Sequence, residues 1–141
     1  MDELNGDAAK AIDHYLAALA VTKENQDRAG EAELYSSLGM AYRKIADYPK
    51  AISFHEARLA ITLELGDRAA EGSAYLSLGL CYYSLERYQK AVEMLEGCLE
   101  IAGEMGDLAL ERKASDSLER SKHMVALRQK QGQHYVDHLA N

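Results

Sequence analysis

The sequence contains the segment Tyr35-Ser-Ser-Leu38-Gly39-Met-Ala-Tyr42 and repeats its pattern, with every residue number raised by 40, as Tyr75-Leu-Ser-Leu78-Gly79-Leu-Cys-Tyr82. The same offset aligns further residues without a gap, namely Ala11, Ala51 and Ala91; Leu19, Leu59 and Leu99; and Asp27, Asp67 and Asp107. A fixed period of this length is typical of stacked supersecondary units, none of which can bury its apolar face without a neighbour. The chain is therefore predicted to be a repeat protein.

Apolar residues recur with helical spacing through most of the chain, and short polar segments separate the runs. The predicted helices span about residues 6–24, 28–45, 48–64, 68–85 and 88–104, and a last helix runs from 108 past Arg128. Asp7, Asp47 and Asp67 are candidate N-caps, and Gly66 suits the left-handed position after a helix. Connections of two or three residues predict antiparallel neighbours and an all-α fold.

All residues are assigned to one domain, 1–141. Its units are a half repeat at 7–27, full repeats at 28–67 and 68–107, a capping helix at 108–131 and a helical or frayed tail at 132–141. After Asp107 the repeat pattern decays, because Ser115, Glu119 and Lys122 stand where the previous unit has Tyr75, Gly79 and Tyr82. Charged replacements of this kind are expected in a terminal helix with one face toward water. The missing first half of the leading unit indicates either a fragment of a longer array or a natural half unit.

The composition argues against several classes of partner. A formal net charge of −7 leaves no general basic surface for nucleic acid, and no apolar run approaches the roughly 20 residues of a membrane span. The first residues lack the pattern of a secretory signal, so the chain is expected to be cytoplasmic. Cys81 and Cys98 are too few for a disulfide framework or a zinc site and are interpreted as buried free thiols.

No motif predicts catalysis, a metal site or a cofactor. The sequence has no nucleophile elbow, phosphate-binding glycine loop or H-E-x-x-H motif, so the chain is not expected to be an enzyme. His134 and His138 stand four residues apart, but no acidic or cysteine partner recurs with them, which favours a solvated tail. His14 and His55 are expected to be partly buried, whereas His123 is either a groove residue or a solvated one.

The repeated segments resemble the tetratricopeptide repeat, whose pattern is an aromatic residue, Leu-Gly, a tyrosine, and an alanine that opens the second helix. Tyr35-x-x-Leu38-Gly39-x-x-Tyr42 followed by Ala51 fits, and so does the unit that follows it. The resemblance implies an α-solenoid of antiparallel helix pairs that acts as a protein-binding adaptor. The period of 40, against about 34 in the usual repeat, also resembles the long repeats of Pins-like adaptors, although their Asn-Leu-Gly-Asn segment reads Ser37-Leu38-Gly39-Met40 here.

In proteins with this repeat, the first helix of each pair lines the concave side, which is implied to hold the partner. A helical wheel then predicts these groove residues: Glu33, Ser36, Met40, Arg43 and Lys44; Ser73, Leu76, Leu80 and Tyr83; and Lys113, Asp116, Arg120 and His123. Met40, Leu76, Leu80 and Tyr83 form a predicted apolar strip that the basic residues frame. The expected occupant is an extended peptide or amphipathic helix with an acidic rim.

Two alternatives remain open for this surface. The apolar strip is either a groove or is covered by the terminal helix and by neighbouring repeats. The exposed terminal helices could instead pair with another copy, which makes self-association the alternative function. The carboxylate clamp of chaperone-binding relatives is not expected, because its implied positions hold Ser36, Met40, Leu76 and Leu80.

Overall fold

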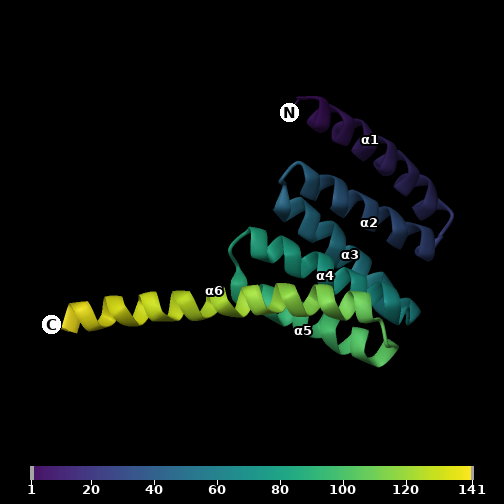
Figure 1. The fold of residues 1–141 in the computed structure, drawn as a ribbon. Helices are drawn as coiled ribbons and strands as arrows, with labels where there is room; N and C mark the ends of the chain where they lie inside the picture. The colour runs from purple at the N-terminus through teal and green to yellow at the C-terminus, as the bar shows by residue number, and fades with distance from the viewer. Residues whose placement is uncertain (1, 141) are drawn as a thin grey trace.

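The computed structural model describes the backbone from Asp2 to Ala140 and the side chains from Gly6 to Ala140. This part of the chain forms six helices and no strand. Their bounds are α1 Asp2–Glu24, α2 Arg28–Lys44, α3 Tyr48–Leu65, α4 Arg68–Ser84, α5 Tyr88–Met105 and α6 Leu108–Ala140. Each helix packs against the next in the chain, and α6 also contacts α4. Figure 1 shows the resulting staggered stack, from which the end of α6 projects well beyond the other helices.

The turns that follow the second helix of each pair repeat the same backbone geometry. Gly66 and Gly106 adopt φ values of 69° and 67°, as expected for a left-handed residue after a helix. Asp67 then accepts a hydrogen bond from the backbone N–H of Ala70 at 3.1 Å, and Asp107 accepts one from Leu110 at 3.1 Å. These local contacts end one helix and start the next, which is why the chain needs only short connections.

Glycine permits the close approach of the two helices within each pair. A Cβ on Gly39 would stand 2.5 Å from the ring of His55, and a Cβ on Gly79 would stand 2.6 Å from Cγ of Leu95. Both distances are too short for a real Cβ atom, so a glycine is needed at both positions. The repeated Leu-Gly pattern therefore fixes how closely α2 packs on α3 and α4 on α5.

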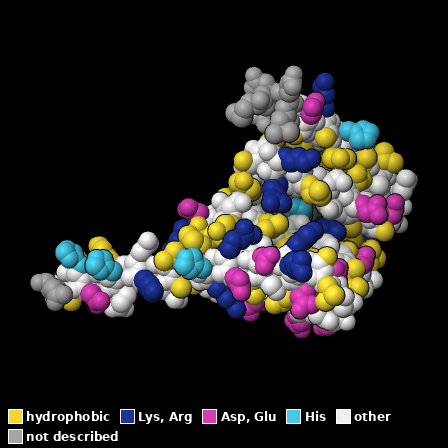
Figure 2. All heavy atoms as spheres, viewed as in Figure 1, with side chains coloured by type: hydrophobic (Ala, Val, Ile, Leu, Met, Phe, Trp, Pro, Cys, Tyr) yellow, Lys and Arg dark blue, Asp and Glu magenta, His cyan; other side chains and the backbone are white. Residues whose placement is uncertain are grey.

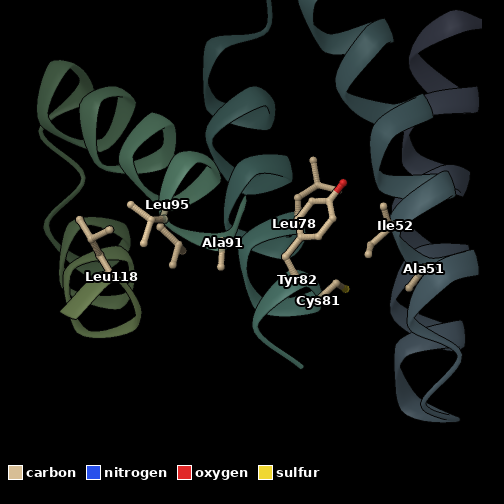
Figure 3. Close-up of a cluster of buried hydrophobic side chains, with 9 residues drawn as sticks. Ala51, Ile52, Leu78, Cys81, Tyr82, Ala91, Leu95 and Leu118 are labelled. Carbon is tan, nitrogen blue, oxygen red and sulfur yellow. The ribbon is translucent and has the colours of Figure 1, made fainter. Parts of the chain in front are cut away.

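The main core runs through the C-terminal helices. Figure 3 shows Ala51 and Ile52 of α3 facing Leu78 and Tyr82 of α4, while Leu95 of α5 lies between α4 and Leu118 of α6. A second cluster joins α1 to α2 through Ile12, Leu19, Leu38 and Ala41. Cys81 and Cys98 are free and buried, as predicted.

Both ends of α2, α3, α4 and α5 were predicted to within one residue. The helices α2 and α4 end at Lys44 and Ser84, one residue before the predicted ends, because Ile45 and Leu85 have non-helical backbone angles. The helices α3 and α5 each extend one residue further than predicted, to Leu65 and Met105.

The first helix was predicted too short. The prediction of Asp7 as an N-cap is wrong, because α1 begins at Asp2 and passes through Gly6 and Asp7. The last helix was predicted to run past Arg128 into a helical or frayed tail, and α6 continues through Gly132 to Ala140, while Asn141 lies outside the described residues. A single glycine costs a helix only about 1 kcal/mol, which is too little to end one without a competing turn.

Candidate peptide-binding groove

A hollow lies where α2, α4 and α6 meet, and it brings together four of the predicted groove residues. It has a volume of about 190 Å³ and is lined by Arg43, Gly79, Leu80, Tyr83, Ser84, Leu95, Ser117 and Arg120. The fully buried Leu95 of α5 lies beneath the hollow, against Gly79, and the packing of α6 on α5 places Arg120 at its edge. Residues of α2, α4 and α6 therefore form the sides of one recess, and Leu95 of α5 lies at its base.

The hollow has a positive edge and an apolar floor. Among the side chains that the structure describes, no acidic group forms an ion pair with Arg43 or Arg120. Arg120 donates only to the hydroxyl of Ser117, at 3.3 Å. Figure 2 shows Lys and Arg side chains, in dark blue, gathered on the face of the solenoid where α6 lies. The guanidinium groups are thus available to an external acceptor.

The charge of Arg43 also acts on groups in the core. Burial raises the pKa of the Cys81 thiol, and Arg43 opposes that rise. Burial, as the main cause, and the charges of Arg58 and Arg43 together lower the pKa of His55 to about 4. The positive charge of Arg43 thus disfavours the protonated ring of His55 and favours the thiolate of Cys81.

The predicted apolar strip is less open than the sequence suggested. Met40 is 56% exposed, but Leu76, Leu80 and Tyr83 are half-buried. Leu76 and Tyr83 pack against the main core cluster, and the ring of Tyr83 meets the ring of Tyr88 edge-on at 5.2 Å. The apolar surface therefore consists of the exposed Met40 and the parts of Leu80 and Tyr83 that face the hollow.

The remaining predicted groove residues lie elsewhere on the surface. Glu33 and Ser36 line a separate recess of about 290 Å³ beside Arg58 and Asp67. Met40 and Lys44 line a third recess, of about 230 Å³, together with Asp7 and Tyr15 of α1. Ser73 is half-buried, and Lys113, Asp116 and His123 are exposed on α6 without lining any of these recesses. The predicted set thus divides into several parts, of which only one is a three-helix hollow.

Sequence reasoning missed a depression that is larger than the three recesses described above. It has a volume of about 620 Å³ and is lined by Glu86, Arg87, Tyr88, Gln89, Lys90, Glu93, Val125, Arg128 and Gln129. The guanidinium of Arg128 lies 4.6 Å from the centre of the Tyr88 ring, and Nη1 donates to the backbone carbonyl of Glu86 at 2.6 Å. The sequence predicted that the last helix runs past Arg128, but no pattern in it indicated that Arg128 would contact Glu86 and Tyr88.

The prediction of two partly buried histidines was wrong for both. His14 is exposed, whereas His55 is only 1% exposed and neither of its ring nitrogens has a hydrogen-bond partner. His55 occupies the place that Leu95 occupies in the next unit, so the offset of 40 could have indicated its burial. His134 and His138 are exposed on α6.

Within the described part of the chain, no group of three or more His, Cys, Asp or Glu side chains is arranged to hold a metal ion. No helix in the same residues is both long enough and apolar enough to cross a membrane.

Family models described as "Tetratricopeptide repeat" match residues 2–64 and residues 72–105, which together are more than half of the chain. This chain is a tetratricopeptide-repeat protein. The family is typically non-enzymatic, and its repeats generally mediate contacts between proteins. The Leu-Gly pattern and the stacked helix pairs described above are thus those of a tetratricopeptide α-solenoid.

A solved structure supports the fold. BtubC (BKLC) from P. vanneervenii superimposes with a TM-score of 0.63 at 22% sequence identity, over 88% of this chain. The aligned region covers 59% of the BtubC chain, so the tetratricopeptide-repeat chain corresponds to a little over half of that protein. A comparison with curated proteins finds no match.

Proposed function

We propose that this chain is a non-catalytic adaptor that holds a peptide segment or an amphipathic helix of another protein on the face formed by α2, α4 and α6. The observation that carries the proposal is the hollow between these helices, where Arg43 and Arg120 flank the exposed parts of Leu80 and Tyr83. Unpaired arginines beside apolar surface do not stabilise a solenoid that has no partner. A partner with an acidic rim would pair with the arginines and cover the apolar surface. The protein-binding role of the family supports the same conclusion.

The exposed methionine beside the hollow extends the proposed contact. Met40 shares a small recess with Arg43 and Lys44, and Arg43 also lines the hollow. A flexible thioether side chain adapts to partners of different shape, so Met40 is suited to pack against an apolar residue of the partner. The proposed groove therefore runs from Met40 to Arg120.

A binding measurement with charge-reversal variants tests this function. The chain with Met40→Glu or with Arg43→Glu should lose affinity for a partner isolated with the unmodified chain, since each variant places a negative charge against the proposed acidic rim. Ser53→Glu and Lys130→Glu make the same two kinds of change at exposed positions away from this face and should bind normally. Unchanged affinity in both groove variants would remove this face from consideration.

Self-association is a second candidate, and exposed apolar residues on the terminal helices favour it. Tyr135, Val136 and Leu139 on the projecting end of α6 are 64%, 57% and 66% exposed, and Leu16 and Val21 on α1 are 40% and 55% exposed. Pairing of these faces between copies would bury them. Light scattering over a range of concentrations separates the two functions, because a chain that stays monomeric at high concentration does not assemble through its ends.

We further propose that this adaptor is cytoplasmic and that it belongs with the Pins-like long-repeat proteins. The repeat period of 40 residues supports the second assignment, and the free Cys81 and Cys98 suit a reducing compartment. Imaging of a fluorescent fusion to the full chain tests the location.

A further inference from the structure

We infer that the hollow between α2, α4 and α6 is a subsite for one Asp or Glu side chain of the bound segment, whose carboxylate lies between Arg43 and Arg120. This inference rests on the proposed function and makes it more specific, because it names the chemistry of the residue that anchors the partner. Four observations carry it: the absence of an ion pair at both of its arginines, the shape of the hollow, its donors, and the limited extent of its charge.

Arg43 and Arg120 form no ion pair with any side chain that the structure describes. Three arginines outside the hollow do form one: Arg28 pairs with Glu64 at 2.8 Å, Arg68 repeats this contact with Glu104 at 2.8 Å, and Arg128 lies 3.5 Å from Glu86. Arg58, Arg87 and Arg112 also lack an ion pair in the described residues, but none of them lines the hollow. Two arginines without an internal partner at one recess leave a positive charge that an acidic group of a partner can neutralise.

The shape of the hollow suits a side chain rather than a whole helix. A volume of about 190 Å³ is that of roughly six water molecules, because each occupies about 30 Å³ in the liquid. Its floor is the contact between Gly79 and Leu95, where the absence of a side chain on Gly79 leaves room above α5. A larger residue at position 79 would both separate the helices and fill the hollow.

The donors around the hollow suit a carboxylate. A guanidinium group presents paired N–H donors that match the two oxygens of a carboxylate, and Arg43 and Arg120 approach from helices on either side of α4. Ser84 and Ser117 line the same space, but the Ser84 hydroxyl already donates to the Leu80 carbonyl at 3.1 Å and the Ser117 hydroxyl accepts from Arg120, so the two arginines are the main donors. The apolar walls of Leu80 and Tyr83 reduce screening by water, which strengthens a charged contact made there.

The limited extent of the positive charge favours a protein partner over nucleic acid. Nucleic acid needs a basic surface that follows successive phosphates, but α5 presents Glu93, Glu96 and Glu100 to solvent and the net charge is −7. One carboxylate requires only the two arginines. The ligand of this subsite is therefore assigned as an acidic side chain of a polypeptide.

The test uses peptides selected for binding rather than an identified partner. Random displayed peptides are selected on the full chain, and the affinity of each selected peptide is measured by fluorescence anisotropy before and after its acidic residues are replaced by the matching amides. The protein variants are Arg43→Gln/Arg120→Gln and a control, Lys122→Gln/Lys130→Gln, which removes the same charge from exposed positions of α6 that do not line the hollow. Circular dichroism melts establish that all variants are folded.

The expected result is a loss of affinity when a carboxylate of the peptide becomes an amide, and this loss should be absent when both arginines are replaced. One acid-to-amide replacement should weaken binding to the unmodified chain and to the lysine control by about tenfold or more, and should have little further effect on Arg43→Gln/Arg120→Gln. If Met40→Glu abolishes binding but no acid-to-amide replacement weakens it, the carboxylate subsite is wrong and the peptide-binding groove is still supported. If Met40→Glu, Arg43→Gln and Arg120→Gln all leave binding unchanged, the subsite and the groove are both wrong. A labelled single-stranded oligonucleotide that binds through the same two arginines would also overturn the assignment.

Discussion

The imidazole of His55 lies against the backbone of Gly39, where a Cβ would be 2.5 Å from ring atoms Cε1 and Nε2. In the next unit, Leu95 makes the equivalent contact with Gly79. The first unit has thus placed a polar ring where the second has an aliphatic side chain. Because both ring nitrogens of His55 are buried without a partner, this contact costs stability that Leu95 does not cost.

Replacing this histidine with the residue found in the next unit should stabilise the protein. His55→Leu removes two unsatisfied nitrogens and keeps a side chain of similar size, so the free energy of unfolding at pH 7 should rise by about 1–3 kcal/mol. Urea denaturation of both chains measures the difference. His14→Leu, which changes an exposed histidine, is the control, and a loss of stability in His55→Leu would contradict the argument.

The same histidine should make the protein sensitive to acid. Burial, with the nearby charges of Arg58 and Arg43, lowers the pKa of His55 from 6.5 to about 4, so the folded state holds the ring neutral while the unfolded chain can protonate it. Above about pH 6.5 the ring is neutral in both states, so the free energy of unfolding carries no protonation cost. As the pH falls toward 4, protonation of the unfolded chain lowers the free energy of unfolding by up to about 3 kcal/mol. Unfolding curves between pH 7 and pH 4 should show this loss in the unmodified chain and a smaller one in His55→Leu.

Two glycines of the second repeat should respond to alanine in opposite ways. In Gly79→Ala the new methyl group meets Cγ of the fully buried Leu95, so the free energy of unfolding should fall by about 1–3 kcal/mol. In Gly103→Ala, within α5, nothing lies within 4 Å, and the better helix former should add up to about 1 kcal/mol. Thermal and urea unfolding of the pair test this contrast, and equal effects would show that close packing at Gly79 is not limiting.

The two thiols should be unreactive until the chain unfolds. Burial raises the pKa of Cys98 to about 11 and raises that of Cys81, so neither forms much thiolate near pH 8. Ellman's reagent should therefore label both only in guanidinium chloride. Rapid labelling of either cysteine in the folded protein would mean that α4 or α5 opens locally.

The sequence was sufficient for the helices and their pairing but not for the site. Gly66, Asp67 and the Leu-Gly pattern act through residues close in sequence, so the offset of 40 located the turns to within one residue. The hollow instead depends on how α6 lies across α4, which joins Arg43 to Arg120 over a long separation. The helical wheel could not show that Leu76 and Tyr83 lean into the core or that Glu33 belongs to another recess.

The projecting end of α6 should be dispensable for folding. All side chains from Gln129 to Ala140 are exposed. Just before this segment, Arg128 contacts Tyr88 and Glu86 of the solenoid. A chain that ends at Gln131 should keep its free energy of unfolding, because the segment it loses buries almost no apolar surface. If the truncated chain also loses a dimer that the longer chain forms in light scattering, then Tyr135, Val136 and Leu139 mediate self-association. If truncation lowers the stability of a strictly monomeric chain, the projecting segment must contact the solenoid, and its exposed position in α6 would be wrong.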